Sequence, residues 1–443
     1  MPTDPRAAIQ SAPMSRFQWG VVATMVGLNA LDGFDVLSIS FASPGIAKEW
    51  GIDRAALGFV LSMELIGMAA GSLLLGGVAD RIGRRGTILM CLGLMTAGMV
   101  AASTTDSVSA LSVWRVLTGL GIGGMLASTN AAVAEAANDK RRSLAVVLMA
   151  VGYPVGTIIG GLVSARLLAH FDWRAVFLFG AVASVCFIPL VLLFAPESIA
   201  FLMHRRPPNA LEKINRVLAR MGHAPVDALP VAEPAASKVP VVELLSRPML
   251  RATGLLTLAY LTHIMTFYFI LKWIPKIVTD MGFAPSAAAG VLVWASVGGA
   301  LGSLLLGLLT GRVPLLRLTI VAMVASAILV TLFGSGQTTL SGLSLVAGLA
   351  GFATNAGVVG LYALIAQSFP TAVRASATGF VIGVGRGGSA LAPALAGILF
   401  AAGYGLQTVA ILMALGSVVA AITLFGMRTW REPQAPVPAQ AST

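Results

Sequence analysis

The sequence predicts an all-α membrane protein whose twelve transmembrane helices form two pseudo-symmetric six-helix halves. Three observations predict this class. Hydrophobic residues make up 57% of the 443-residue chain and charged residues only 11%, much less charge than a water-soluble domain carries. Apolar runs of about 18 residues or more, long enough to cross a bilayer, recur along nearly the whole chain. Finally, part of the first half recurs in the second half.

Each apolar run is expected to be one membrane-spanning helix. The first run is too long for the apolar core of a cleaved leader peptide. The expected spans are residues 18–43, 55–78, 87–105, 109–134, 142–169, 173–195, 250–274, 286–310, 316–334, 338–369, 372–401 and 403–427.

The spans divide the chain into five parts. These are an N-terminal arm, a six-helix bundle, a polar linker, a second six-helix bundle and a tail, at residues 1–17, 18–195, 196–248, 249–427 and 428–443. The arm and the tail are expected to be disordered. Within the linker, the basic, amphipathic segment from Ala210 to Met221 predicts a helix lying on the inner membrane surface.

The net charge of +11 reflects membrane topology, and we expect no nucleic-acid partner. With the N-terminus inside, 21 of the 29 lysines and arginines fall in inner segments, as the positive-inside rule requires. Five fall in outer loops, namely Lys48, Arg54, Arg174, Lys272 and Lys276. Both termini are therefore expected in the cytoplasm, with the basic segments against anionic lipids of the inner (plasma) membrane.

An internal repeat supports the two halves. Residues 71–76, Gly-Ser-Leu-Leu-Leu-Gly, recur as residues 302–307, an offset of 231 positions. The same offset relates Gly152 to Gly383 and Gly156 to Gly387. Parallel six-helix repeats are one way in which transporters build a central binding site.

The chain offers no enzyme motif. Gly119, Gly121 and Gly124 match a dinucleotide-binding string, but they lie inside a long apolar span and indicate close helix packing instead. The sequence contains no HExxH, GxSxG or CxxC pattern. We therefore expect no enzymatic activity, cofactor or metal site.

Two aspartates interrupt the first span, in the sequence Asp32-Gly33-Phe34-Asp35. Residues three apart share a helical face. Apolar surroundings favour the neutral form of a carboxyl group, and two neighbouring carboxylates disfavour joint ionisation. Asp32 and Asp35 are therefore candidates to carry protons; the alternative is a solvated pair at a helix end.

Further charges lie within apolar spans, where a charged side chain costs about 2.5–3.5 kcal/mol on insertion scales. Arg386, among glycines, is the first candidate to bind a substrate carboxylate bidentately, or else it pairs with an internal acid. Arg115 is a second candidate. Glu64 is either a second protonation site or an ion partner of Arg115 or Arg386.

The loop after the second span reads Gly-Gly-Val-Ala-Asp80-Arg81-Ile-Gly83-Arg84-Arg85. This G-x-x-x-D-R-x-G-R-R pattern resembles the signature of the major facilitator superfamily. Asp32-Gly-Phe-Asp35, taken with this loop, is similar to the aromatic acid:proton symporter family within it. The resemblance extends over most of the chain.

The resemblance implies roles for several residues. The span-one aspartates would be needed for transport, and Arg115, Arg374 and Arg386 would be functionally important. An inner latch is expected to stabilise one conformation of the carrier through ion pairs. Its candidate residues are Asp80, Arg81, Gly83, Arg84, Glu135 and Arg374.

Other candidates rest on position alone. His263 maps onto Asp32 at the 231-residue offset. It is expected either to face Asp32 and share the proton or to be a packed, satisfied residue. Tyr153, Tyr260 and Tyr362 either stack on an aromatic substrate or serve as packing.

The predicted function is proton-coupled uptake of a small organic anion, an aromatic carboxylate of the benzoate or hydroxybenzoate type, by a monomer in contact with membrane lipids. Protons are the coupling ion. Two alternatives remain. One is a carrier of the same fold that imports a non-aromatic acid or exports a drug, and the other is a membrane sensor without transport.

Overall fold

The computed structural model describes residues 4–75, 77–229, 244 and 246–427. These residues form fifteen helices and no strand. Twelve of the helices are long and apolar enough to cross a membrane, which confirms the predicted all-α membrane fold. The predicted tail (428–443) and part of the polar linker (230–243 and 245) lie outside the described residues.

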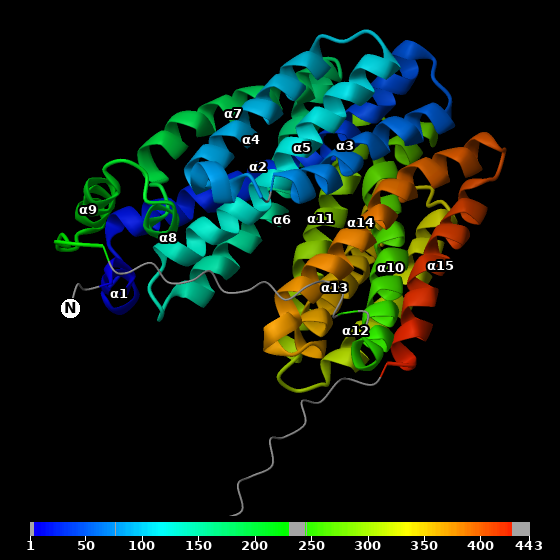
Figure 1. The fold of residues 1–443 in the computed structure, drawn as a ribbon. Coiled ribbons are helices and arrows are strands. Elements are labelled where there is room, and N and C mark those ends of the chain that lie inside the picture. The colour runs from blue at the N-terminus through cyan, green and yellow to red at the C-terminus, as the bar shows by residue number, and fades with distance from the viewer. Residues whose placement is uncertain (1–3, 76, 230–243, 245, 428–443) are drawn as a thin grey trace, which may run out of the picture.

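The first six spans form one bundle and the last six a second bundle (Figure 1). The first bundle contains α2 (Arg16–Trp50), α3 (Arg54–Leu74), α4 (Ala79–Ser103), α5 (Val108–Ala136), α6 (Arg142–His170) and α7 (Arg174–Phe194). The second contains α10 (Arg247–Asp280), α11 (Pro285–Leu309), α12 (Leu315–Gly334), α13 (Leu340–Ser368), α14 (Thr371–Ala401) and α15 (Leu406–Phe425). Three short helices, α1 (Pro5–Ser11), α8 (Ile199–Arg205) and α9 (Ala210–Met221), lie outside the bundles.

Local sequence sets the turns between spans. Gly51 ends α2 in the left-handed conformation, at φ 61°. Two residues later, the Asp53 carboxylate accepts a hydrogen bond from the Ala56 amide at 2.7 Å and so caps α3. A glycine after a helix and an aspartate before the next are the usual signals for such a turn.

The repeat is visible as matching glycine contacts. Gly67 and Gly71 of α3 pack directly on main-chain carbonyls of α5. In the second bundle, Gly298 and Gly302 of α11 pack in the same way on carbonyls of α13. Because any side chain at these glycines would meet backbone, the two bundles share the same close crossing of their second and fourth spans.

The 231-residue offset does not hold for the later glycines. Gly156 packs on the Ala30 carbonyl and Gly388 on the equivalent Leu261 carbonyl, so Gly388 is the counterpart of Gly156. Nothing lies close to Gly387, the counterpart that the sequence predicted. The second bundle therefore has one extra residue between its second and fifth spans.

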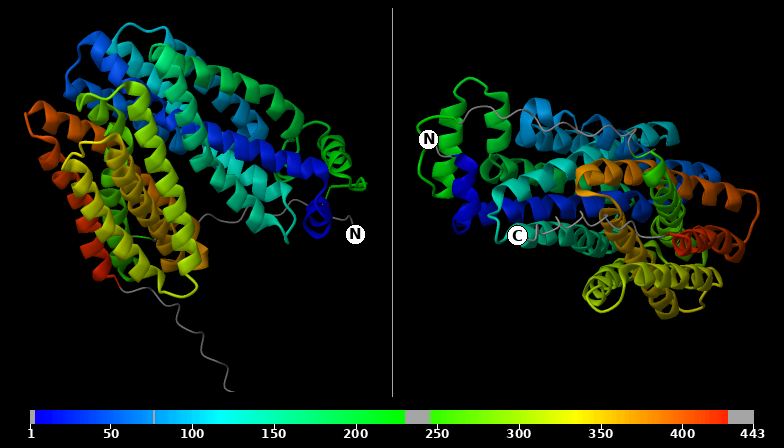
Figure 2. Two further views of the ribbon diagram at one scale, coloured as in Figure 1. Left: turned by 180° about the vertical axis from the view of Figure 1, so that it is seen from behind. Right: turned by 60° about the horizontal axis from the view of Figure 1, so that its bottom comes forward.

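The two bundles touch at one end and lean apart toward the other (Figures 1 and 2). We call the end with α1, α8 and α9 the terminal end, and the other the opposite end. Near the opposite end, Arg54 of α3 pairs with Asp280 of α10 at 2.9 Å. On the same side, Ser62 accepts a hydrogen bond from the Ala394 amide of α14 at 3.1 Å.

The three short helices form a cap on the first bundle only. Ile9 of α1 packs with Ile199 and Leu202 of α8 and with Ile214 and Leu218 of α9. The prediction that residues 1–17 are disordered is therefore wrong for the described part. The predicted bounds of α9 are correct, but its apolar face is buried by protein and is not left for a membrane surface.

The arm is also tied to the first bundle by hydrogen bonds. The Asn138 side chain, between α5 and α6, donates to the Ala12 carbonyl at 2.8 Å. The Asp139 amide donates to the Gln10 carbonyl at 3.1 Å. Ser15 and Gln18 then start α2 with a reciprocal capping box.

Spans one and seven are longer than predicted. Polar residues near their ends lowered the apparent hydropathy, but α2 continues to Trp50 and α10 to Asp280. Lys272, which the predicted span 250–274 already contained, lies within α10 and is fully buried. Its assignment to an outer loop is wrong.

Candidate functional site

Two carboxylic acids without hydrogen-bond partners lie inside the first bundle. Asp32 is 2% exposed and Asp35 is 0% exposed. None of their four carboxyl oxygens has a hydrogen-bond partner within the described part of the chain. A buried, unsatisfied carboxylate is costly, and the neutral acid avoids much of that cost. This arrangement suits a pair of groups that gain and lose protons.

Glycines create the space around the two acids. Gly33, between them, faces the Tyr153 carbonyl of α6 so closely that a side chain would collide with it. Gly180 of α7 leaves room for the Asp35 carboxyl group, whose Oδ1 lies about 3.1 Å from where a Gly180 Cβ would stand. The acids are therefore enclosed by closely packed helices, which rules out the alternative of a solvated pair at a helix end.

Three charged side chains meet beside Asp35. Glu64 of α3 forms an ion pair with Arg115 of α5 and a second one with Lys272 of α10, at 3.1 Å. All three side chains are 0% exposed. Lys272 comes from the second bundle, whereas Glu64 and Arg115 belong to the first. Glu64 is therefore an ion partner of Arg115, one of the roles predicted for it.

Main-chain oxygens accept hydrogen bonds from both cations of this ion triad. Arg115 donates to the Asp35 carbonyl at 3.1 Å, and its guanidinium stands 5.2 Å from the centre of the Phe177 ring. Lys272 donates to the Val36 carbonyl. Ionised groups this deeply buried are tolerated only when paired and hydrogen-bonded. In this arrangement Arg115 has no surface left for the substrate carboxylate that it was predicted to bind.

Arg386, the first candidate for binding a carboxylate, lies at the contact between the bundles. It is half-buried on α14 and donates to the Met68 carbonyl of α3 at 3.4 Å. No Asp or Glu within the described ranges forms an ion pair with it, so the alternative of an internal acid partner is not observed. A guanidinium held by a single long hydrogen bond keeps most of its donors for a ligand.

Of the predicted tyrosines, Tyr153 lies in the first bundle, and Tyr260 and Tyr362 lie in the second. Tyr260 of α10 is buried, and its hydroxyl lies 3.1 Å from that of Tyr362 of α13, which is 41% exposed. Gly385, next to Arg386, makes room for the Tyr260 ring. Tyr153 of α6 is half-buried. Tyr260 and Arg386 are thus neighbours, and Tyr362 offers an accessible ring beside them.

His263 has its hydrogen bonds within the second bundle. Its Nε2 donates to the Thr354 carbonyl and its Nδ1 lies against the Ser417 hydroxyl, both at 2.9 Å. The ring is 0% exposed. Both nitrogens are occupied by second-bundle partners, so the expectation that His263 faces Asp32 is wrong. This matches the alternative of a packed, satisfied residue.

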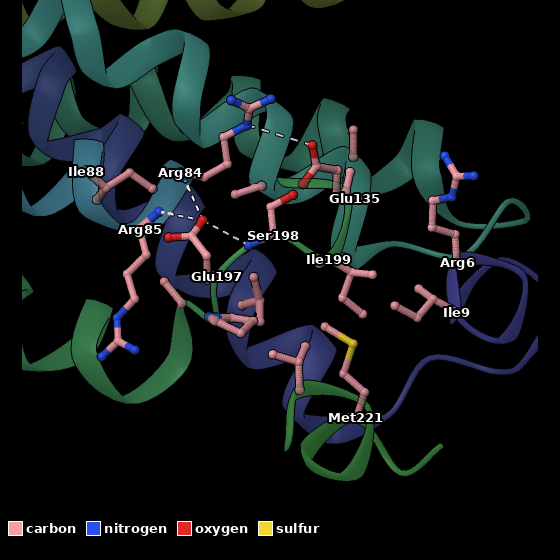
Figure 3. Close-up of a pocket in the computed structure, with 18 of the residues that line it drawn as sticks. Arg6, Ile9, Arg84, Arg85, Ile88, Glu135, Glu197, Ser198, Ile199 and Met221 are labelled. Atoms are coloured by element: carbon pink, nitrogen blue, oxygen red, sulfur yellow. Dashed lines mark hydrogen bonds and ion pairs between the residues drawn. The ribbon is translucent and has the colours of Figure 1, made fainter. Parts of the chain in front are cut away.

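The predicted latch residues Arg84 of α4 and Glu135 of α5 point toward each other at the terminal end (Figure 3), and Asp80 of α4 pairs with Arg84 there. The Arg84 guanidinium lies 3.3 Å from Asp80 and 3.8 Å from Glu135. Gly83 interrupts the helix at φ 87° and ψ 170°, a backbone conformation that is essentially restricted to glycine. Arg81 is exposed.

Arg374 does not join this cluster. It lies in the second bundle, where it is exposed and donates to the Phe369 carbonyl at 3.3 Å. No ion pair links it to α4 among the described residues. The latch in this structure is therefore built within the first bundle.

Sequence reasoning missed Glu197 as a member of the cluster. Its carboxylate accepts hydrogen bonds from the amides of Arg84 at 2.7 Å and Arg85 at 3.4 Å. It thus caps the helix that restarts after Gly83, where free amides attract an anion. The available signal was that Glu197 follows the span 173–195 on the same membrane side as the basic loop at residues 80–85.

A pocket of about 290 Å³ lies between this cluster and the cap. Charged side chains from five segments line it, including Arg6, Arg84, Glu135 and Glu197 (Figure 3), and also Arg142. The Ile9 and Met221 side chains form part of its apolar lining. None of the buried acids and none of the ion triad lines it.

A bundle pair of this kind, with charged groups enclosed between its halves, defines a class of membrane transporter. The family model of the Major Facilitator Superfamily matches residues 25–348 and 256–442. The chain therefore belongs to the major facilitator superfamily, and it is a transporter and not an enzyme.

Known proteins resemble the chain along almost its whole length. A gallate transporter of Pseudomonas putida is 29% identical over 426 residues, which cover 96% of this chain and 94% of that protein. The 4-hydroxybenzoate transporter PcaK of Acinetobacter baylyi is 28% identical, covering 95% and 93%. The crystal structure of a D-xylose–proton symporter has the same fold, with a TM-score of 0.71 at 18% identity, covering 93% and 97%.

Proposed function

We propose that this protein takes up a small aromatic carboxylate together with protons, by alternating access between its two halves. The observation that carries the proposal is the pair of buried acids, Asp32 and Asp35, whose carboxyl oxygens have no hydrogen-bond partner in the described chain. The similarity to transporters named for gallate and 4-hydroxybenzoate supports the aromatic class of the substrate.

In this proposal each part of the site has one task. Asp32 and Asp35 carry protons. Arg386 binds the substrate carboxylate, and Tyr260 and Tyr362 supply ring surfaces beside it. An arginine fork matches the geometry of a carboxylate, and aromatic rings stack favourably on one another.

The distribution of basic residues supports an orientation. With Lys272 reassigned to the interior, the opposite end keeps Lys48, Arg54, Arg174 and Lys276, whereas the terminal end carries most other lysines and arginines. By the positive-inside rule the terminal end then faces the cytoplasm. The structure, closed at the opposite end, then represents an inward-open carrier in the plasma membrane.

The driving force depends on the number of protons. One proton moving with a monoanion gives an electroneutral cycle driven by the pH gradient alone. A second proton would add the membrane potential, worth about 2.3 kcal/mol per charge at 100 mV. One chain supplies both halves, so we propose that the monomer is the working unit.

The test is uptake of labelled carboxylates by purified carrier in liposomes under an imposed pH gradient. The panel contains benzoate, 4-hydroxybenzoate, gallate and the non-aromatic cyclohexanecarboxylate. We expect accumulation of at least one aromatic acid, and its loss when a protonophore removes the gradient. The proposal fails if no aromatic acid accumulates, or if accumulation survives the protonophore.

A further inference from the structure

Lys272 is a buried cation whose partners all lie in the other bundle. It is on α10 of the second bundle, and its Nζ lies 3.1 Å from Glu64 of α3. It also donates to the Val36 carbonyl of α2. Both of these partners belong to the first bundle. Any movement that separates α10 from α2 and α3 at this level must therefore break both contacts.

The other two members of the ion triad would keep their partners in such a movement. Glu64 and Arg115 pair with each other within the first bundle, and Arg115 holds the Asp35 carbonyl of the same bundle. Only Lys272 would be left without its partners. Since a buried ammonium without a partner is strongly unfavourable, separation requires that water or another anion reaches Lys272.

Two other polar contacts between the bundles on this side are weaker in kind. Arg54 and Asp280 form an ion pair at 2.9 Å, but their side chains are 44% and 28% exposed. Exposed pairs contribute little, because water already solvates both charges. Ser62 and Ala394 share one hydrogen bond. Among these polar contacts, the fully buried Lys272 ion pair is thus the one that costs most to break.

We propose that Lys272, held by Glu64 and the Val36 carbonyl, is the gate residue that keeps the opposite end of the carrier closed. Opening that end for substrate entry withdraws Lys272 from the first bundle. This inference rests on the proposed function in one respect, namely that the halves separate at this end during the transport cycle.

The chain contains a matched control. Lys276 lies one helical turn further along α10 and pairs with Asp280 on its own helix. Replacing Lys276 therefore removes a lysine ion pair of α10 that does not itself join the bundles, and it leaves Asp280 paired with Arg54 of α3. Lys272→Met and Lys276→Met delete the same charge and add side chains of the same shape.

Gate opening is measured by the chemical accessibility of a cysteine at the closed contact. The reporter is Ser62→Cys on α3, because Ser62 is 2% exposed and contacts α14. The native Cys91 and Cys186 are replaced by alanine and serine. In membrane vesicles, a membrane-impermeant maleimide is added from the side of the opposite end, and the labelling rate is followed.

We expect Lys272→Met to raise the labelling rate at least about fivefold over the reporter protein alone, and Lys276→Met to leave it unchanged. Lys272→Arg, which keeps a cation, should label as slowly as the reporter protein. An unchanged rate in Lys272→Met overturns the proposal, and so does an equal rise in Lys276→Met. If Lys272→Met does not purify as a folded carrier, Lys272→Gln takes its place with the same outcomes.

Labelling requires no transported substrate. Even if the carrier accumulates no aromatic acid, the labelling rate of Ser62→Cys still shows whether Lys272 keeps the opposite end closed. A failure of the proposed substrate and a failure of the gate are therefore separate results.

Discussion

Gly397 of α14 packs directly on Gly58 of α3, so two helices from different halves cross with no side chain between them. A Cβ at Gly397 would stand about 3.0 Å from the Gly58 Cα and closer still to the Arg54 carbonyl. Both neighbours are backbone atoms, which cannot move away by changing a side-chain rotamer. The closed end of the carrier thus depends on the absence of side chains at this crossing.

Substitution of Gly397 tests this dependence. Gly397→Val should force α3 and α14 apart, at a cost of about 1–3 kcal/mol for overpacking, and lower the rate of uptake. Gly379→Ala, on the same helix with no neighbour close to it, serves as the control. Uptake in liposomes would be compared at equal amounts of folded protein, and equal rates for the two variants would show that the crossing is not needed.

Asp35→Asn separates proton coupling from substrate binding. Asparagine has nearly the same shape as the neutral acid but cannot exchange a proton, so we expect accumulation driven by a pH gradient to be lost. Exchange of labelled for unlabelled substrate, which needs no net proton movement, should persist. Asp106→Asn, at an 88% exposed aspartate, is the control. Normal gradient-driven accumulation by Asp35→Asn would exclude Asp35 from coupling.

Arg386→Lys should weaken substrate binding. Lysine keeps the charge but loses the planar fork that matches a carboxylate. Loss of a charge-assisted hydrogen bond costs about 1.5–3 kcal/mol, so the KM for uptake should rise about tenfold or more. Arg317→Gln, at an exposed position of α12, should leave KM unchanged. If the KM of Arg386→Lys stays within twofold of the parent value, a residue other than Arg386 binds the substrate carboxylate.

Gly83→Ala should destabilise the latch. The backbone at Gly83 has φ 87° and ψ 170°, which costs a residue with a side chain about 1–3 kcal/mol, and the new methyl group would meet Glu197. Gly86→Ala, three residues along α4 where a Cβ makes ordinary contacts, is the control. The measurement is the midpoint of thermal unfolding in detergent. If the midpoint of Gly83→Ala is as high as that of Gly86→Ala, a side chain at position 83 causes no backbone strain and the prediction is wrong.

His263→Ala should affect stability without affecting coupling. It removes the hydrogen bond to the Thr354 carbonyl and one of the two side-chain contacts of the Ser417 hydroxyl, which still contacts Ser326, at a cost of about 1–3 kcal/mol. We expect a lower midpoint of unfolding, with the dependence of uptake on pH unaltered. If the pH dependence of uptake shifts at equal amounts of folded protein, His263 takes part in proton coupling and the prediction is wrong.

The twelve spans could be predicted from the sequence because apolar length alone decides whether a helix crosses a membrane. The environment of a single polar residue within a span could not. Lys272 lies near the end of an apolar run, where sequence alone does not distinguish a loop lysine from a buried one. Only the folded chain brings Glu64, 208 positions away, to its ammonium group.

The internal repeat shows a second limit. A constant offset of 231 correctly related Gly71 to Gly302, but one added residue in the second bundle makes Gly388 the counterpart of Gly156. Glycine-rich helices offer a glycine at almost any offset, so the sequence could not detect this shift. The same limit applies to His263, since an equivalent position does not imply an equivalent partner.

The length of α2 has a mechanical consequence. Its 35 residues extend about 52 Å at 1.5 Å per residue, and about 30 Å separates Val36, where Lys272 is held, from Arg16. A rotation of about 10° around that contact, typical of rigid-body motion, moves the far end of the helix by about 5 Å. The length of the helix therefore amplifies a small rotation. A tilt that leaves most of the packing around Val36 intact displaces the Arg16 end by more than the thickness of an aromatic ring.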